Sequence, residues 1–232
     1  QEHRRLHFHL PRLQEDEVFF WNTPRGQPDL GALARLLSEA EPHGHALAGL
    51  GFFTAALFAH QVAQRLGMFP FLSFFGESHT GKSVLLKVLH RLVGREWEGM
   101  PVNEANTKVG QSRYIGAYSN LPVALIEADA HENVKVEAIM NLRTAYNRGA
   151  IRVTGVKSHD NTLRAVPFRG ALVFGWNEEK LDDAKVRERM VSLRFAQADN
   201  SAAKLQALIA LENIPTGQMA AFLDAILKRR HE

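Results

Sequence analysis

The stretch Gly76-Glu77-Ser78-His79-Thr80-Gly81-Lys82-Ser83 decides the fold, because it is a complete G-x-x-x-x-G-K-[ST] pattern. The apolar run Phe69–Phe75 precedes it, and its aromatic residues predict a strand buried on both faces of a parallel sheet. The residues from Lys82 to Val93 are predicted to form a helix that ends at Gly94. A strand, a glycine loop and a helix in this order form the context in which the pattern binds phosphate.

The residue types of this loop suit a nucleoside triphosphate. Gly76 and Gly81 allow backbone N–H groups to curl around phosphate oxygens, and the helix N-terminus adds a positive dipole. Lys82 is predicted to neutralise charge on the β- and γ-phosphates, and the Ser83 hydroxyl to coordinate Mg²⁺. His79 occupies a variable position and is predicted to face solvent. We therefore expect ATP and Mg²⁺ as cofactors.

A second apolar strand is predicted at Leu121–Asp129, and it ends in two acids, Glu127 and Asp129. The carboxyl end of a parallel strand brings a carboxylate beside the phosphate loop, where it can hold Mg²⁺ and orient water. Glu127 is assigned to the metal side, with Asp129 as its partner. A core strand that simply ends in an acidic loop is the alternative, since acids often follow strands.

A third apolar strand, Gly170–Trp176, ends at Asn177. An amide at this position can donate and accept hydrogen bonds at once, so it can contact both the γ-phosphate and the attacking water. Asn177 is therefore a candidate catalytic residue.

Arg187 and Arg189 come just before a further strand-like run, Met190–Phe195. Arginines beside the sheet that face outward suit fingers that insert into the ATP site of a neighbouring subunit. Of the two, Arg189 is favoured because it abuts the apolar run. The alternative is a surface helix in which both arginines pair with neighbouring acids.

A hairpin is predicted between the acids and Asn177. Two β-rich runs flank a polar turn, Ser158 to Asn161, which places Lys157 and His159 at or beside the tip. Phosphate contacts from such residues carry no base-sequence information, as suits a protein that moves along a nucleic acid strand. A polar tip that serves solubility alone is the alternative.

Positive charge is concentrated around this hairpin. The chain has a net charge of +3, but residues 134–170 carry seven Lys and Arg against two acids, a balance of +5. The remaining chain has 21 basic against 23 acidic residues, a balance of −2. Such a concentration is typical of a surface that meets phosphates, although a solvated basic face has the same composition.

The order of these elements resembles the superfamily 3 helicases within the AAA+ class, the hexameric helicases of small DNA viruses, phages and mobile elements. The resemblance covers about Phe69 to Phe195, and within it only the phosphate loop is individually specific. These families have adjacent acids at the end of the second strand, whereas Ala128 separates Glu127 from Asp129 here. The residue that activates water is therefore left unassigned.

The resemblance implies ATP-driven unwinding of DNA by a ring. Lys82, Ser83, Glu127 and Asn177 would act in one subunit, and Arg187 or Arg189 would reach in from the next. Lys157 and His159 would contact the DNA. The expected partners are single-stranded or forked DNA, further copies in a homo-hexamer, and a primase or other domain before Gln1, since the chain does not begin with Met. A P-loop ATPase that acts as a protein-assembly or regulatory switch is the main alternative, and a small-molecule kinase is a further one.

The whole pattern predicts an α/β fold, a P-loop NTPase (AAA+-like) three-layer core with a mostly parallel sheet and flanking helices. Residues 1–45 are predicted to be a lead-in linker or helical collar segment with one helix capped by Asp29. Residues 46–196 are predicted to form the ATPase core, and residues 197–232 a helical segment.

Composition is that of a globular domain, with 45% hydrophobic and 23% charged residues among 232. The absence of cysteine excludes disulfides and thiolate metal sites and makes a cytoplasmic setting the default. The stretch from Gly44 to Gln64 has no charged residue, but polar side chains interrupt it. We therefore expect a buried helix from Ala46 to Leu66 and no membrane association.

Overall fold

The structure is a computed structural model, and it describes residues 18–19, 29–102, 108–127, 142–155, 163–177 and 184–229. Its centre is a five-stranded sheet with the order β4 (Met100–Val102), β5 (Ser119–Glu127), β8 (Arg169–Trp176), β2 (Phe71–Gly76) and β9 (Met190–Phe195). Every neighbouring pair in this sheet runs parallel. The α/β class with a mostly parallel sheet, predicted from the sequence, is confirmed.

Burial on both faces explains the continuous apolar runs of the central strands. In β5 all residues from Asn120 to Leu125 are buried, and in β8 all residues from Gly170 to Phe174. β8 lies between β5 and β2 although it follows both of them in the chain. Such an order is possible because parallel strands are joined by long crossover connections rather than by tight turns. As a consequence, the carboxyl ends of β2, β5 and β8 meet at one edge of the sheet.

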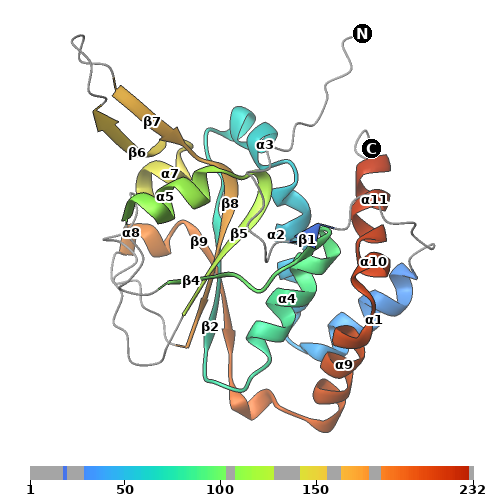
Figure 1. Cartoon of the computed structure of the whole chain (residues 1–232). Coiled ribbons are helices and arrows are strands. Elements are labelled where there is room, and N and C mark those ends of the chain that lie inside the picture. Colours follow the sequence, from blue (N-terminus) through green and yellow to red (C-terminus); the bar gives the residue numbers. More distant parts are fainter. Residues whose placement is uncertain are drawn as a thin grey trace.

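Helices lie on both sides of the sheet (Figure 1). The helices of the described residues are α1 (Leu30–Ala40), α2 (His45–Ala56), α3 (Ala59–Leu66), α4 (Lys82–Leu92), α5 (Lys108–Gly116), α7 (Leu142–Tyr146), α8 (Ala184–Arg187), α9 (Ala202–Asn213), α10 (Thr216–Met219) and α11 (Ala221–Lys228). Figure 1 shows α2, α3 and α4 along one face, with α1, α9, α10 and α11 outside them. The short helices α5, α7 and α8 lie on the other side, near the amino ends of the parallel strands.

The predicted single helix from Ala46 to Leu66 was wrong, because the chain bends by 82° between α2 and α3. At the break, the N–H groups of Leu57 and Phe58 bond to carbonyls three residues back, the tight pattern that ends a helix. The bend buries both Leu57 and Ala59 completely. Within the described part of the chain, no single helix is long and apolar enough to span a membrane; α2 and α3 meet that test by length and composition only as this bent pair.

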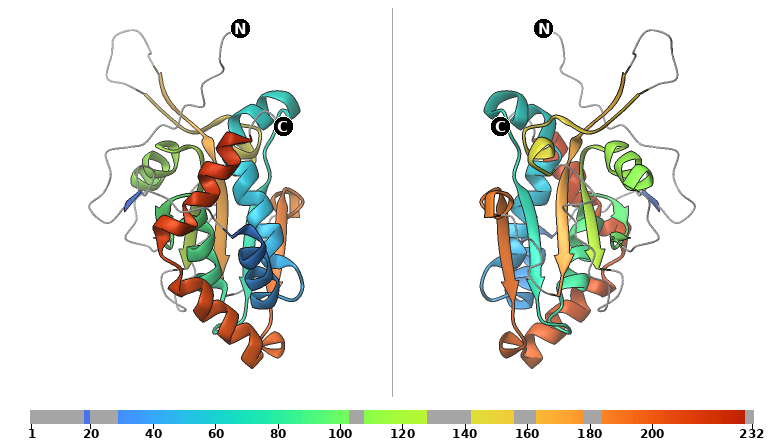
Figure 2. Two further views of the ribbon diagram at one scale, coloured as in Figure 1. Left: turned by 90° about the vertical axis from the view of Figure 1, so that its right-hand side faces the viewer. Right: turned by 90° about the vertical axis from the view of Figure 1, so that its left-hand side faces the viewer.

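The predicted hairpin is confirmed. β6 (Ala150–Gly155) and β7 (Leu163–Pro167) pair antiparallel and project from the end of the molecule where the parallel strands begin (Figures 1 and 2). Arg148 fixes the base of the hairpin, since its guanidinium donates to the carbonyls of Arg169 and Gly170. Burial lowers the pKa of Arg148 to about 10. Arg148, one of the seven basic residues of this region, thus has a structural role at the base of the hairpin.

The segment before the core, which contains α1, packs against the segment after the core, which contains α9. Asp29 caps α1 as predicted, since its Oδ1 accepts a hydrogen bond from the Ala32 N–H at 2.8 Å. α1 packs against α9, and the two are joined by a buried ion pair between Glu41 and Lys204, with an O···N distance of 3.3 Å. At the other flank, β1 (Val18–Phe19) pairs with β3 (Arg95–Glu96).

Candidate nucleotide-binding site

The glycine loop connects β2 to α4 at the carboxyl edge of the sheet, and the segment after β9 lies against it. A Cβ atom on Gly76 would lie 1.9 Å from the Phe195 carbonyl oxygen, and one on Gly81 would lie 2.7 Å from Leu208 Cδ1. Both glycines also have positive φ, 132° and 87°. The glycines of the pattern are therefore required by the backbone conformation and by the close approach of later parts of the chain.

Lys82 lies folded over the loop. Its Nζ donates to the carbonyl oxygens of Gly76 at 2.7 Å and Glu77 at 2.5 Å, and it lies 3.3 Å from Thr80 Oγ1. Partial burial lowers the pKa of Lys82, whereas the nearby carboxylates of Glu127 and Glu77 raise it. The side chain thus brings a cation to the part of the loop where the sequence predicts phosphate.

His79 is exposed, in agreement with the sequence prediction, and it has a φ of 60°. Positive φ is uncommon outside glycine, although histidine is among the residues enriched there. Its carbonyl accepts a hydrogen bond from Asn200 Nδ2 at 3.1 Å. The residue of the loop with the strained backbone, His79, is therefore hydrogen-bonded by Asn200, a residue from outside the loop.

The structure brings four of the predicted residues to one cavity of about 150 Å³. Lys82 and Ser83 line it from α4, Glu127 from the end of β5, and Asn177 from the residue after β8. The Asn177 N–H donates to Glu127 Oε2 at 2.9 Å, which ties the ends of two neighbouring strands together. Asp129, the second predicted acid, lies outside the described residues.

Glu98 also lines this cavity, and the sequence did not predict it. It precedes β4 and is exposed. Gly99 lies next to it with a φ of 144°, and a Cβ there would lie 2.7 Å from Ile126 Cγ2. A glycine-containing loop before a three-residue strand is too weak a sequence pattern to mark an acid as part of a site.

The residues of this cavity fit a bound Mg²⁺. Ser83 supplies a hydroxyl oxygen and Glu127 a carboxylate, the hard donors that this ion prefers. Among the described residues, no group of three or more histidine or acidic side chains is arranged to hold a metal. Nucleotide-bound Mg²⁺ needs only one or two protein ligands, because phosphates and water complete its coordination.

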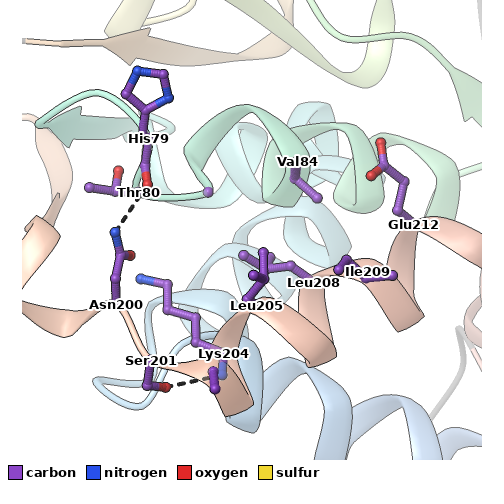
Figure 3. Close-up of a pocket in the computed structure, with 12 residues that line it drawn as sticks. His79, Thr80, Val84, Asn200, Ser201, Lys204, Leu205, Leu208, Ile209 and Glu212 are labelled. Carbon is purple, nitrogen blue, oxygen red and sulfur yellow. Dashed lines mark hydrogen bonds between the residues drawn. The ribbon is translucent and has the colours of Figure 1, made fainter.

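A second cavity, of about 610 Å³, lies on the other side of the loop, between the start of α4 and α9 (Figure 3). Val84, Leu205, Leu208 and Ile209 give it an apolar lining. Leu205 and Ile209 are 59% and 50% exposed, respectively. The cavity can therefore accept a flat apolar group bound next to the phosphate loop.

The two arginines lie far from this edge. The Arg189 carbonyl accepts a hydrogen bond from the N–H of Phe71 at the start of β2, whereas the glycine loop follows the end of that strand. The Arg189 guanidinium packs over the Tyr146 ring at 4.9 Å from its centroid. Arg187, at the end of α8, is exposed. Neither arginine lines the cavity that contains Lys82.

The predicted nucleic-acid contacts, Lys157 and His159, lie outside the described residues. The strands that lead to them are described, and Val153 and Leu163 on these strands are 54% and 67% exposed. The hairpin projects from the end of the sheet opposite the glycine loop (Figure 1).

Comparison with known proteins gives no family model and no curated protein that matches the chain. Among solved structures, the chain is similar to the active helicase Cch of SCCmec type IV, with a TM-score of 0.54 and 14% identity, over 88% of this chain and 38% of that one. The apo C-terminal region of NrS-1 has a TM-score of 0.46 at 17% identity, over 90% and 53%. The JCV helicase has a TM-score of 0.40 at 14% identity, over 84% and 60%.

The sheet order and the glycine loop at its edge define an α/β protein with a P-loop fold. At 14% identity, the likeness to the SCCmec helicase is a likeness of fold alone. The chain spans less than two thirds of each of these three solved chains.

Proposed function

We propose that this chain is the ATPase core of a DNA helicase or translocase of superfamily 3 type. It would hydrolyse ATP with Mg²⁺ at the subunit interfaces of a homo-hexameric ring, in replication of a phage or mobile element. The observation that best supports the proposal is that Lys82, Ser83, Glu127 and Asn177 line one cavity at the carboxyl edge of the sheet. These residues come from the start of α4 and from the ends of β5 and β8, so their meeting is a property of the fold rather than of one sequence motif.

In this proposal the loop from Gly76 to Ser83 binds the triphosphate, and the apolar cavity beside α9 accepts the base. Ser83 and Glu127 would hold Mg²⁺, which supplies charge neutralisation between the β- and γ-phosphates. Lys82 would exchange its carbonyl partners for phosphate oxygens. The nucleotide would thus span both cavities, with the loop between them.

Asn177 has two roles in this arrangement. Its backbone N–H holds Glu127 Oε2, and its side-chain amide is free to orient water beside the γ-phosphate, as an amide can donate and accept. Besides its proposed contact to Mg²⁺, Glu127 is one of two candidates for the base that activates water, and Asp129 is the other. Glu127→Gln and Asp129→Asn test this division, because the variant that binds ATP but does not hydrolyse it identifies the base.

Arg187 is the better candidate for a trans-acting finger. Both arginines lie at the amino edge of the sheet, so neither can reach the ATP site of its own chain. Arg187 is exposed, whereas Arg189 packs over Tyr146. The geometry thus favours the opposite arginine from the one that sequence position favoured.

The test is steady-state ATP hydrolysis by the purified chain with and without single-stranded DNA, together with its mass in solution. A helicase core should assemble in the presence of nucleotide and hydrolyse ATP faster when DNA is added. DNA-independent hydrolysis would support the assembly-switch alternative instead. Absence of hydrolysis in an assembled sample that binds ATP would contradict both.

A further inference from the structure

The segment between β9 and α9, here called the connector, is hydrogen-bonded to the glycine loop. Gln197 Nε2 donates to the Ser78 carbonyl at 3.1 Å, and Asn200 Nδ2 donates to the His79 carbonyl at 3.1 Å. In the same sense, the Gln197 N–H donates to Glu77 Oε2 at 2.6 Å. Three successive loop residues are thus bound to a segment about 120 residues later in the chain.

These bonds decide which way the loop amides point. A trans peptide unit is planar, so its C=O and the N–H that follows point in opposite directions. The described residues contain no cis peptide. When the Ser78 carbonyl points toward the connector, the His79 N–H therefore points away from it, and the His79 carbonyl and Thr80 N–H are related in the same way.

A loop that binds phosphate needs its N–H groups turned toward the anion, and a carbonyl turned inward would repel it. The backbone does not fix this orientation alone, since His79 has a φ of 60°, which costs free energy outside glycine. Thr80 adds a contact within the loop, because its hydroxyl donates to the Glu77 carbonyl. The connector supplies the external support.

We propose that Gln197 and Asn200 are positioning residues, which hold two loop carbonyls outward so that the N–H groups of His79 and Thr80 are set for phosphate oxygens before nucleotide binds. The inference rests on the proposed nucleotide-binding function and adds two residues that neither touch the reacting atoms nor belong to the glycine pattern. Presetting the amides removes an ordering cost from binding and therefore raises affinity.

The connector is itself anchored, as a positioning element must be. Asp199 Oδ1 lies 3.1 Å from His43 Nε2, and Ser201 Oγ caps α9 by accepting from the Lys204 N–H at 3.1 Å. Lys204 in turn forms the buried pair with Glu41. The supports of the loop therefore extend to α1, on the far side of α9.

The experiment measures the dissociation constants of ADP and Mg²⁺-ATP by titration calorimetry. We expect Gln197→Ala and Asn200→Ala each to weaken binding about three- to tenfold, the loss of one hydrogen bond that orients an amide. Asn200→Asp, which keeps the shape but cannot donate to a carbonyl, should weaken binding at least as much. Gln206→Ala and Asn213→Ala, at exposed positions of α9, are the matched controls and should bind as the wild type.

Thermal unfolding of the nucleotide-free protein separates a positioning role from a structural one. A structural role would lower the unfolding midpoint of Gln197→Ala and Asn200→Ala while the folded protein kept its affinity, and that result would overturn the inference. A Lys82→Ala arm tests the proposed function separately. If Lys82→Ala loses binding while both connector variants bind normally, only the positioning role fails; if the wild type binds neither nucleotide, both proposals fail.

Discussion

The two ends of the central sheet differ in how closely their residues are constrained. At the carboxyl end, Gly76 lies against the Phe195 backbone and Lys82 is bonded to loop carbonyls, so each residue has neighbours on several sides. At the amino end, the base of the hairpin packs against α5 and α7, but its outer part is open, since a Cβ added to Gly155 would meet no atom within 4 Å. Substitutions near the glycine loop should change geometry and chemistry, whereas substitutions at the outer part of the hairpin should change only what contacts the hairpin from outside.

The largest expected effect is at Lys82. Lys82→Ala removes the cation beside the phosphates and should abolish ATP hydrolysis, a loss of more than about a thousandfold. Phosphate release with Mg²⁺-ATP measures the loss. Lys87→Ala is the matched control, because Lys87 lies on the same helix with its side chain 39% exposed and should keep the wild-type rate. Wild-type turnover by Lys82→Ala would show that the carboxyl end is not the reaction site.

Arg187 tests whether the two ends cooperate between subunits. Arg187→Ala should reduce hydrolysis about a thousandfold in the assembled protein, the scale of a lost arginine finger. Mixing it with Lys82→Ala should restore part of the activity at interfaces that combine an intact loop with an intact arginine. Arg189→Ala should instead lower the free energy of unfolding by about 1 kcal/mol through lost stacking on Tyr146. Absence of rescue in assembled mixtures would exclude a trans role for Arg187.

A pair of glycine variants compares the two ends directly. Gly76→Ala should lower the free energy of unfolding by about 2 to 4 kcal/mol, because its Cβ would lie 1.9 Å from the Phe195 oxygen. Gly155→Ala should change it by less than about 0.5 kcal/mol. Urea denaturation followed by circular dichroism measures both. Equal effects would mean that packing does not distinguish the two ends.

The smallest expected effects are at the hairpin tip. Lys157→Ala and His159→Ala should each weaken binding of single-stranded DNA about threefold at low salt, with little dependence on base sequence. Fluorescence anisotropy with two unrelated oligonucleotides at two salt concentrations measures this. Lys228→Ala, whose side chain is 75% exposed on α11, serves as the control. Equal affinities for the wild type and both tip variants would remove the hairpin from the proposed DNA contacts.

The sequence predicted the central strands well, for a physical reason. Parallel strands buried on both faces must be apolar along their length, and β2, β5 and β8 lie where such runs occur, whereas the edge strand β9 is buried only at Leu193 and Phe195. The bend between α2 and α3 could not be predicted, because the residues on both sides form helix and the tertiary packing alone decides where they separate. The short strands β3 and β4 carry too few residues for a recognisable pattern.

The candidate site was predictable where its residues belong to strand ends. Glu127 and Asn177 follow apolar runs, and parallel topology places such residues at one edge. Gln197 and Asn200 were not predictable, because an amide in a short connector has no pattern that relates it to a loop 120 residues earlier. Nor does sequence position tell which of two nearby arginines packs inward and which is exposed.

The contact between the connector and the loop has a consequence for synthesis of the chain on the ribosome. The loop emerges roughly 6 to 24 s before its supports, since about 120 residues separate Glu77 from Gln197 and translation adds about 5 to 20 residues per second. During that interval the nascent chain contains the full glycine pattern, but neither the amides of the connector nor Leu208 of α9 are present beside it. On the proposed function, the nascent chain should therefore reach its full affinity for ATP only after the connector and α9 have emerged.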